Sequence, residues 1–460
     1  MKTENTPTGQ IESLMTEQRE FFKTGKTLDI AFRREKLKAL GQALKEWEKP
    51  LLDALMKDLH KSEEESILTE LSIVSGEVRN HQKHLKSWSK PDKRPTPLKM
   101  MPSKCWITYE PLGCSLIIAP WNYPVQLLLN PLVGSISAGC TAILKPSPYV
   151  PHVSDVIGRM IKDTFDENYI GVVQGDRTVN KVLLTHKFDI IFFTGSPSLG
   201  KTVMKAAAEH LTPVVLELGG KSPCIVDRTA DMDLAARRIA WGKTLNAGQT
   251  CIAPDYLLIH TSLLNRFIEA FRKEIRCLHG DDPRNSKHYV RLVNERAFDR
   301  VSGYLTNGHI ATGGHTVRDE LYIEPTLLTD VDPLSPIMQE EIFGPVLPIL
   351  TYERITEVVD FINSRQKPLA LYYFGDSKTG KEVIRMTSAG GSCINDTIMH
   401  IANEHLPFGG VGNSGMGHYH GYESFKAFSH QRSVVDTPTW IDLPFRYMPY
   451  NMFKWVKRIL

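Results

Sequence analysis

The sequence is short of the features that mark disulfide-rich, metal-binding or secreted proteins. Its 460 residues include only seven cysteines, an odd number with no Cys-x-x-Cys pair. This usage argues against a disulfide framework and a zinc site, and it favours a reducing compartment. The first residues, Met-Lys-Thr-Glu-Asn-Thr, lack the apolar core of a signal peptide. We therefore expect a cytoplasmic protein with no bound metal.

Charge of one sign and long hydrophobic runs are also scarce. The 55 basic and 52 acidic residues leave a formal net charge of +3, which gives no reason to expect a nucleic-acid partner. Residues 125–144 are apolar enough to raise the question of a membrane span, but a proline and several polar residues interrupt them. A buried helix followed by a buried strand is the better interpretation.

The order of the apolar patterns predicts an α/β fold of two or more lobes, as the length requires. Residues 11–89 carry a helical pattern, and prolines between 91 and 102 then mark a boundary. Beyond it, short apolar runs alternate with helix-like segments, which is typical of parallel βαβ units. The first set of expected strands lies at 115–119, 141–144, 171–173, 189–193 and 214–216. The second set lies at 256–259, 326–329, 346–350, 370–374 and 392–394.

The end of the chain mixes aromatic residues with three cations. From Phe445 to Leu460 it includes Lys454, Lys457 and Arg458. The segment could form an amphipathic surface helix that touches a membrane, or a cap packed on the protein near the substrate entrance. Its shortness favours the cap.

Two motifs supply the groups that a covalent thioester mechanism needs. Residues 248–251 read Gly-Gln-Thr-Cys, a composition that predicts an exposed turn at a helix end rather than a buried structural cysteine. A helix end favours the thiolate form of Cys251, which attacks carbonyl carbon. Residues 217–221 read Glu-Leu-Gly-Gly-Lys, so Glu217 ends an apolar run where ligands gather in α/β sheets. Its carboxylate could activate the water that releases an acyl group, although a solvated strand end is the alternative.

Four glycine-containing or aromatic motifs accompany them. Residues 121–124 read Trp-Asn-Tyr-Pro, and residues 340–345 read Glu-Glu-Ile-Phe-Gly-Pro. Residues 195–200 follow an expected strand and open a helix near Ser198, where backbone amides attract phosphate; an ordinary strand–helix connection is the alternative. Residues 410–415 match Gly-x-Gly-x-x-Gly, but no apolar strand precedes them, so we interpret them as a structural loop.

Together these motifs make the chain resemble the NAD(P)-dependent aldehyde dehydrogenase family over nearly its whole length. Residues 248–256 and 395–400 resemble the class 3, or fatty aldehyde dehydrogenase, branch in particular. The resemblance implies oxidation of medium- or long-chain aliphatic or aromatic aldehydes to carboxylic acids, with NAD or NADP as cofactor. It also implies an α/β fold of two parallel-sheet Rossmann-type domains with a small β oligomerisation arm, and a homodimer.

The family's plan divides this chain into four parts. Residues 1–90 and 113–215 are expected to form the NAD(P)-binding domain, and residues 216–400 the catalytic domain. Residues 91–112 and 401–435 would form the oligomerisation arm, and residues 436–460 the tail.

The resemblance also implies a role for individual residues. Cys251 is the expected nucleophile and Glu217 the general base for thioester hydrolysis. The side chain of Asn122 and the backbone N–H of Cys251 are expected to form the oxyanion hole, and Tyr123 to line the substrate tunnel. The residues expected to bind the cofactor are Trp121, Lys145, Gly195, Ser196, Gly200, Glu341 and Phe343.

One position departs from the pattern of many relatives. They carry a glutamate three positions after the residue that matches Lys145, where it holds the ribose 2′-hydroxyl. This chain has Pro148 at that position. The missing carboxylate removes that hydrogen bond and also a repulsion against a 2′-phosphate. We therefore expect NADP to be tolerated beside NAD.

Three other functions remain as alternatives. A CoA-acylating dehydrogenase would pass the thioester to CoA, but such relatives usually lack the equivalent of Glu217. A cysteine hydrolase would need a histidine beside Cys251, and the sequence places none of the 16 histidines there. A catalytically idle relative is disfavoured because the motif residues are intact.

Overall fold

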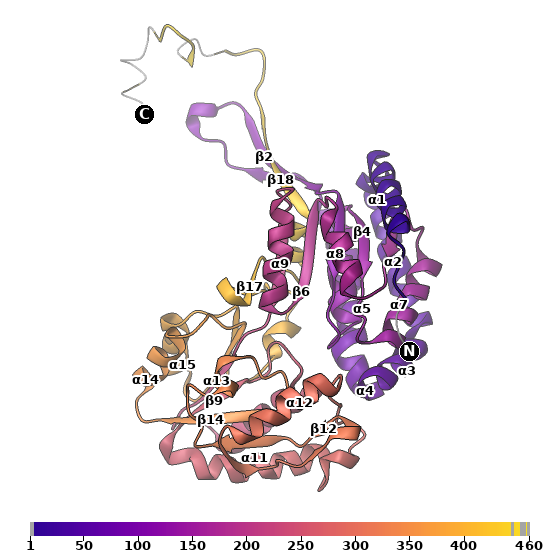
Figure 1. The fold of residues 1–460 in the computed structure, drawn as a ribbon. Coiled ribbons are helices and arrows are strands. Elements are labelled where there is room, and N and C mark those ends of the chain that lie inside the picture. The colour runs from indigo at the N-terminus through magenta and orange to yellow at the C-terminus, as the bar shows by residue number, and fades with distance from the viewer. Residues whose placement is uncertain (1–3, 443–445, 451–456, 458–460) are drawn as a thin grey trace.

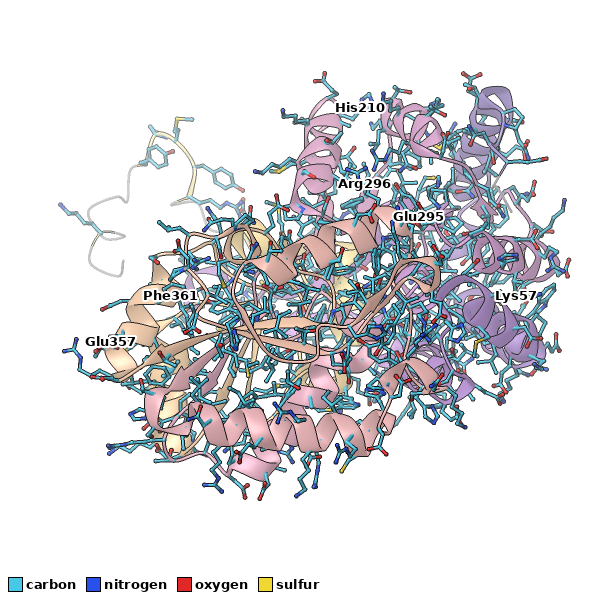
Figure 2. All side chains as sticks on the ribbon, turned by 60° about the horizontal axis from the view of Figure 1, so that its bottom comes forward. Lys57, His210, Glu295, Arg296, Glu357 and Phe361 are labelled. Atoms are coloured by element: carbon cyan, nitrogen blue, oxygen red, sulfur yellow. The ribbon has the colours of Figure 1, made fainter. Side chains whose placement is uncertain are left out.

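The chain folds into two large sheets, each covered by helices, and a small arm that projects from one end (Figure 1). The structure is a computed structural model that describes residues 4–442, 446–450 and 457. Exposed charged side chains such as Lys57 and His210 lie at the periphery of the molecule (Figure 2). Among the described residues, no helix combines the length and the apolar character needed to cross a bilayer.

The N-terminal helices form a layer beside the first sheet, as their apolar spacing predicts. They are α1 (Thr8–Lys23), α2 (Ile30–Glu46), α3 (Glu48–Leu59) and α5 (Ser72–Trp88). A short helix, α4 (Glu63–Ser66), and a π-helical turn over Ile67–Leu71 join α3 to α5. Helices α2 and α5 pack on α6 (Gln126–Ala138), and α3 packs on α7 (Pro151–Thr164).

Helix α6 is surrounded by protein on all sides. Every one of its residues is buried, and it contacts α2, α5, α16 (Tyr422–Ala427) and the first sheet. The strand β4 (Thr141–Lys145) that follows is buried along its whole length. The interpretation of residues 125–144 as a buried helix and strand is therefore confirmed.

The first sheet has six strands in the order β17-β7-β6-β3-β4-β5. The five strands expected from the sequence are present and parallel, and they alternate with α6, α7, α8 (Arg177–Thr185) and α9 (Pro197–Ala208). Besides β4, they are β3 (Cys114–Ile118), β5 (Ile170–Val172), β6 (Ile190–Gly195) and β7 (Val214–Leu218). Strand β17 (Gly415–Met416) was not expected; it pairs antiparallel with β7.

The second sheet has seven strands in the order β10-β13-β14-β9-β8-β15-β16. The five expected strands are β9 (Tyr256–His260), β13 (Thr326–Thr329), β14 (Val346–Tyr352), β15 (Ala370–Phe374) and β16 (Gly391–Ile394). The sequence interpretation missed β8 (Pro223–Val226) and β10 (His309–Thr312). The helices α10 (Met232–Thr244), α11 (Leu264–His279), α12 (Glu295–Gly303), α13 (Pro336–Gln339), α14 (Ile355–Asn363) and α15 (Ser377–Met386) lie between its strands.

The arm is a three-stranded antiparallel sheet. Its strands are β1 (Asp92–Arg94), β2 (Lys104–Pro111) and β18 (Ser429–Asp436), in the order β1-β2-β18. It lies at the end of the molecule farthest from β14 and α11 (Figure 1). Within residues 401–435, β18 joins the arm, whereas β17 joins the first sheet and α16 packs on α6. The exact domain boundaries stay a prediction.

Candidate active site

A cleft of about 1020 Å³ lies at the carboxyl ends of strands β6 and β7, the edge where parallel sheets collect ligands. It contains most of the residues that the sequence singled out. From that set, the cleft is lined by Trp121, Asn122, Gly195, Ser196, Glu217, Cys251, Glu341 and Phe343.

Cys251 follows a loop that runs through left-handed backbone. Asn246, Ala247 and Gly248 have φ values of +52°, +52° and +73°. A Cβ on Gly248 would lie 2.3 Å from the carbonyl oxygen of Gly344. Glycine is therefore required there, both for the backbone angle and for the close approach. The contact fixes the loop before Cys251 against the residue after Phe343.

The surroundings of Cys251 differ from the exposed turn that we expected. Its side chain is partly buried against the main hydrophobic core. Burial raises the pKa of the thiol, and the nearby carboxyls of Glu341 and Glu217 raise it further. The backbone N–H groups of Cys251 and Ile252 lower it only in part. Burial and the two carboxyls therefore outweigh the expected stabilisation of the thiolate by a helix end.

Glu217 has a carboxyl group without a partner. Both of its oxygens are buried, and neither has a hydrogen-bond partner within the described part of the chain. Burial raises the pKa of Glu217 well above its ordinary value. In the sheet, Glu217 is the antiparallel register partner of Gly415 on β17. An unpartnered buried carboxyl costs stability, which a functional role in the cleft would explain.

The amide of Asn122 is held next to the cysteine loop. Its Nδ2 donates a hydrogen bond to the carbonyl oxygen of Gln249 at 2.9 Å, and the residue is almost fully buried. The second hydrogen on Nδ2 is free to meet an oxygen in the cleft. The hydroxyl of the next residue, Tyr123, lies 2.6 Å from the hydroxyl of Thr250. Tyr123 does not line the cleft, so its role in a substrate tunnel stays a prediction.

The segment at residues 340–345 contributes Glu340, Glu341 and Phe343 to the lining of the cleft. The rings of Trp121 and Phe343 meet edge to face, with centroids 5.5 Å apart. The Glu341 carboxyl lies so close to Gly219 that a Cβ there would be 1.9 Å from Oε2. Burial raises the pKa of Glu341 to about 8.

The glycine turn at residues 195–200 forms one end of the cleft. Helix α9 begins at Pro197, one residue before the expected start, and Ser196 precedes it without a side-chain cap bond in the structure described. The first backbone N–H groups of α9 are therefore available to an anion. A Cβ at Gly200 would lie 2.6 Å from the side chain of Leu218, and the contact of Gly200 with the cofactor stays a prediction.

Two other sequence features lie apart from the cleft or at its margin. Lys145 is buried, and its Nζ donates to the carbonyl oxygens of Pro146 and Gly175 at 2.8 and 2.7 Å. It is absent from the cleft lining as described, so its contact with the ribose stays a prediction. Residues 410–415 form a loop that includes Asn413, which lines the cleft, and Gly415, which pairs with Glu217.

The sequence reasoning missed the cations of the cleft. Arg300, Arg365 and Lys367 line it, and Arg300 donates hydrogen bonds to the carbonyl oxygens of Glu341 and Ile342. Lys221 also lines it and pairs with Asp255. Lys221 lies within a quoted motif, but no local pattern marks the other three, because the fold brings them from distant segments.

These features define the class of protein. The free helix terminus, the cations and the size of the cleft fit a dinucleotide, and the glycines leave room for it. A thiol, an amide donor and an unpartnered carboxyl stand in the same cleft. The chain is thus an α/β protein with a dinucleotide-sized cleft that holds a thiol beside a carboxyl group.

Comparison with known proteins gives the family. The model of the aldehyde dehydrogenase family matches residues 1–434. The 4,4'-diaponeurosporen-aldehyde dehydrogenase of Staphylococcus aureus is 48% identical over 97% of this chain and 98% of that protein. The dimeric NADP-preferring aldehyde dehydrogenase of Rattus norvegicus is 46% identical over 92% of this chain and 94% of that protein. A substrate-bound structure of Staphylococcus aureus AldH has a TM-score of 0.96 at 47% identity, covering 98% of this chain and 99% of that one.

The chain belongs to the aldehyde dehydrogenase family. It is an enzyme that oxidises aldehydes, with NAD or NADP as its cofactor. The resemblance that the sequence motifs indicated, and the α/β fold that it implied, are confirmed.

Proposed function

We propose that Cys251, Asn122 and Glu217 carry the chemistry of aldehyde oxidation in this cleft. The thiol proton of Cys251 passes to the solvent, the sulfur forms a bond to the aldehyde carbon, and the carbonyl π electrons move to the oxygen. The second hydrogen on Asn122 Nδ2 and the N–H of Cys251 then hold this oxyanion. Bound NAD or NADP supplies the hydride acceptor, and loss of hydride leaves a thioester on Cys251.

Glu217 acts in the second half of the reaction. Its carboxylate removes a proton from water, whose oxygen bonds to the thioester carbon while the C–S bond breaks. The carboxylic acid leaves and the sulfur of Cys251 is regenerated. The observation that carries this role is the buried carboxyl of Glu217, which has no partner among the described residues and lies in the same cleft as the thiol. A carboxylate with a raised pKa is also a stronger base once ionised.

The cofactor would lie along the cleft from α9 to the loop after α13. The N–H groups at the start of α9, with Gly195 and Ser196, would hold the pyrophosphate. Trp121, Glu341 and Phe343 would hold the nicotinamide end, near Cys251. Gly200 and Lys145 would also contact the cofactor, and Lys145 would reach the ribose after its Nζ leaves the carbonyl oxygens of Pro146 and Gly175.

The substrate class is medium- or long-chain aliphatic or aromatic aldehydes. The support comes from the branch that the motifs resemble and from the name of the Staphylococcus aureus relative, which gives 4,4'-diaponeurosporen-aldehyde as its substrate. Transfer of the acyl group to CoA is the weaker alternative, because Glu217 supplies a base for hydrolysis.

The protein would work as a cytoplasmic homodimer joined through the arm. The rat relative is named as dimeric, and the arm exposes apolar side chains such as Leu98, at 82% exposure. Such apolar surface is typical of an interface. The tail helix suggested for residues 445–460 lies mostly outside the described residues, and its contact with a membrane or with the substrate entrance stays a prediction.

One experiment tests the function. NADH and NADPH formation would be followed by absorbance for the wild type and Cys251→Ala across a chain-length series of aldehydes, without CoA. We expect reduction by the wild type alone, with a preference for longer or aromatic aldehydes. Reduction only after CoA is added would instead identify the acylating alternative.

A further inference from the structure

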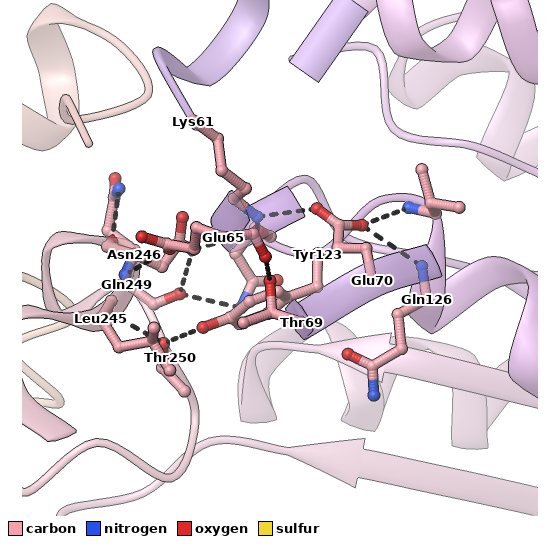
Figure 3. Close-up of polar contacts among 12 residues, drawn as sticks. Lys61, Glu65, Thr69, Glu70, Tyr123, Gln126, Leu245, Asn246, Gln249 and Thr250 are labelled. Carbon is pink, nitrogen blue, oxygen red and sulfur yellow. Dashed lines mark hydrogen bonds and ion pairs between the residues drawn. The ribbon is translucent and has the colours of Figure 1, made fainter. Parts of the chain in front are cut away.

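A buried polar network, drawn in Figure 3, contacts the backbone of Asn122 through side chains that do not line the cleft. It joins the N-terminal helices to the segments that carry Asn122 and Cys251. Its ionisable members are Lys61, Glu65 and Glu70, and the side chains of Lys61 and Glu70 have no solvent exposure. None of the three enters the reaction described above.

Lys61 ties the backbone of Asn122 to Glu70. Its Nζ lies 2.7 Å from Glu70 Oε1 and donates to the carbonyl oxygen of Asn122 at 3.1 Å. The same ammonium lies over the ring of Tyr123, 4.3 Å from its centroid. A single cation therefore contacts both residues that follow Trp121.

Glu70 holds the same segment from its other end. Its second oxygen, Oε2, accepts the N–H of Val125 at 2.8 Å and the N–H of Gln126 at 3.3 Å. These are backbone donors at the start of α6, which would otherwise lack partners. Glu70 lies in the π-helical turn Ile67–Leu71, and such turns are frequent at functional sites. Lys61 and Glu70 thus fix the chain on both sides of Tyr123.

Asn246 connects this segment to the cysteine loop. Its Nδ2 donates to the carbonyl oxygens of Asn122 at 3.0 Å and Gln249 at 3.1 Å. The Gln249 carbonyl is also the acceptor for the side chain of Asn122. The Glu65 carboxyl accepts the N–H of Asn246 at 2.9 Å, which supports its left-handed backbone.

A buried ion pair is a weak source of stability, because removing two charges from water costs about as much as their attraction returns. An oxyanion hole, in contrast, depends on donors that are already in place. We propose that Lys61 and Glu70 are positioning residues that fix the Asn122 backbone and aim its amide at the oxyanion. This inference rests on the proposed role of Asn122.

A cofactor-free reaction isolates this role. With p-nitrophenyl acetate, Cys251 sulfur bonds to the acyl carbon while p-nitrophenolate leaves with the electrons of its C–O bond. The thiol proton passes to the buffer. The first-turnover burst of p-nitrophenolate, per titrated active site, therefore measures acylation and oxyanion stabilisation without hydride transfer.

Lys61→Met, Asn122→Ala and the double variant form the test cycle. Asn122→Ala is expected to slow acylation by about 100- to 1000-fold. Lys61→Met is expected to slow it by about 10- to 100-fold, since small displacements of a catalytic group have effects of this size. Because Lys61 acts through Asn122, the double variant is expected to be no slower than Asn122→Ala alone.

Arg33→Met is the matched control. Arg33 is another buried cation that donates to backbone carbonyls, those of Thr27 and Ser137, and these contacts lie outside the cleft. The Arg33→Met variant should have a lower midpoint of thermal unfolding than the wild type, with an unchanged rate of acylation per active site. Lys61→Met/Glu70→Gln removes both charges of the pair, so that no charge remains buried alone if the single variant fails to fold.

The outcomes separate the two hypotheses. The proposal is supported if acylation is slower in Asn122→Ala and in a Lys61 variant than in the wild type, and if the double variant is no slower than Asn122→Ala. A folded Lys61 variant that acylates within about twofold of the wild type, or effects that multiply, overturns it while leaving the role of Asn122 intact. Wild-type acylation by Asn122→Ala would overturn the proposed oxyanion hole and this inference together.

Discussion

Gly248 lies directly against the carbonyl of Gly344, which joins the loop before Cys251 to the cofactor wall after Phe343. A Cβ at Gly248 would lie 2.3 Å from that oxygen, and its φ of +73° disfavours any side chain. The proposed nucleophile and the ring proposed to hold the nicotinamide are thus fixed relative to each other by two backbones in contact.

Gly248→Ala should therefore damage the site. We expect a loss of at least about 100-fold in kcat/KM, because the loop must move, and a stability loss of about 1–3 kcal/mol from the strained backbone. Steady-state kinetics and thermal unfolding measure the two effects. Gly9→Ala is the control: it lies in α1, and nothing within 4 Å in the described structure meets its Cβ. Equal kinetics for both variants would contradict the proposed contact.

The pH dependence of deacylation follows from Glu217. Burial raises its pKa well above the ordinary value, so the ionised base is scarce at low pH. The base must be ionised to take a proton from water, and the deacylation rate constant should rise with pH until Glu217 is fully ionised. The deacylation rate constant is measured by following the single-turnover release of acetic acid from enzyme that has been treated with p-nitrophenyl acetate. Glu217→Gln should remove the rising limb; a wild-type rate that falls as pH rises would contradict the assignment.

Glu77 should control stability in acid. Burial alone would raise its pKa, but the hydrogen bond from His81, the nearby His420 and the N–H of Gly421 lower it to about 2, from an ordinary value of 4.5. A carboxyl whose pKa is lowered in the folded state stabilises the fold above pH 4.5. This contribution, on the order of 3 kcal/mol, is lost as the pH falls towards 2.

Denaturant unfolding between pH 3 and 7 tests this. Glu77→Gln should be less stable near neutral pH and should lose less stability on acidification than the wild type. Glu382→Gln, which removes an exposed ion pair with Arg385, is the control and should follow the wild-type profile. Parallel curves for the wild type and Glu77→Gln would contradict the proposed ionisation.

Cofactor preference should depend on position 148. With Pro148 in place of a carboxylate, the wild type should use NADP with a kcat/KM within about 100-fold of that for NAD, or about 2.7 kcal/mol. Pro148→Glu should lower kcat/KM for NADP by about 10-fold through repulsion of the 2′-phosphate, an effect of about 1.4 kcal/mol. The same variant with NAD is the internal control. A wild-type preference for NAD above about 100-fold would contradict the interpretation.

Much of the architecture could be predicted from periodicity. Ten expected strands are present because each is a short apolar run between helices. Strand β17 has only two residues, Gly415 and Met416, and its pairing with β7 depends on tertiary contacts that no local pattern encodes. Strand β8 begins at Pro223, a residue that usually argues against a strand.

The candidate site was predictable where its chemistry is local. Cys251, Glu217 and Asn122 lie in short motifs, and the structure places all three in one cleft. The electrostatics could not be predicted, because the raised pKa of Cys251 depends on burial and on Glu341 from a distant segment. The same holds for Lys61 and Glu70, whose pairing depends on how α4 and the π-helical turn pack behind Asn122.

In the proposed reaction, an acyl group forms on Cys251 and Glu217 releases it. Intact-mass measurement of Glu217→Gln after mixing with aldehyde and NAD tests it most directly, with Cys251→Ala as the control. We predict an added mass equal to the acyl group on Glu217→Gln, confined to the peptide with Cys251, and none on Cys251→Ala. Steady turnover of Glu217→Gln near the wild-type rate, with no added mass, would contradict the account.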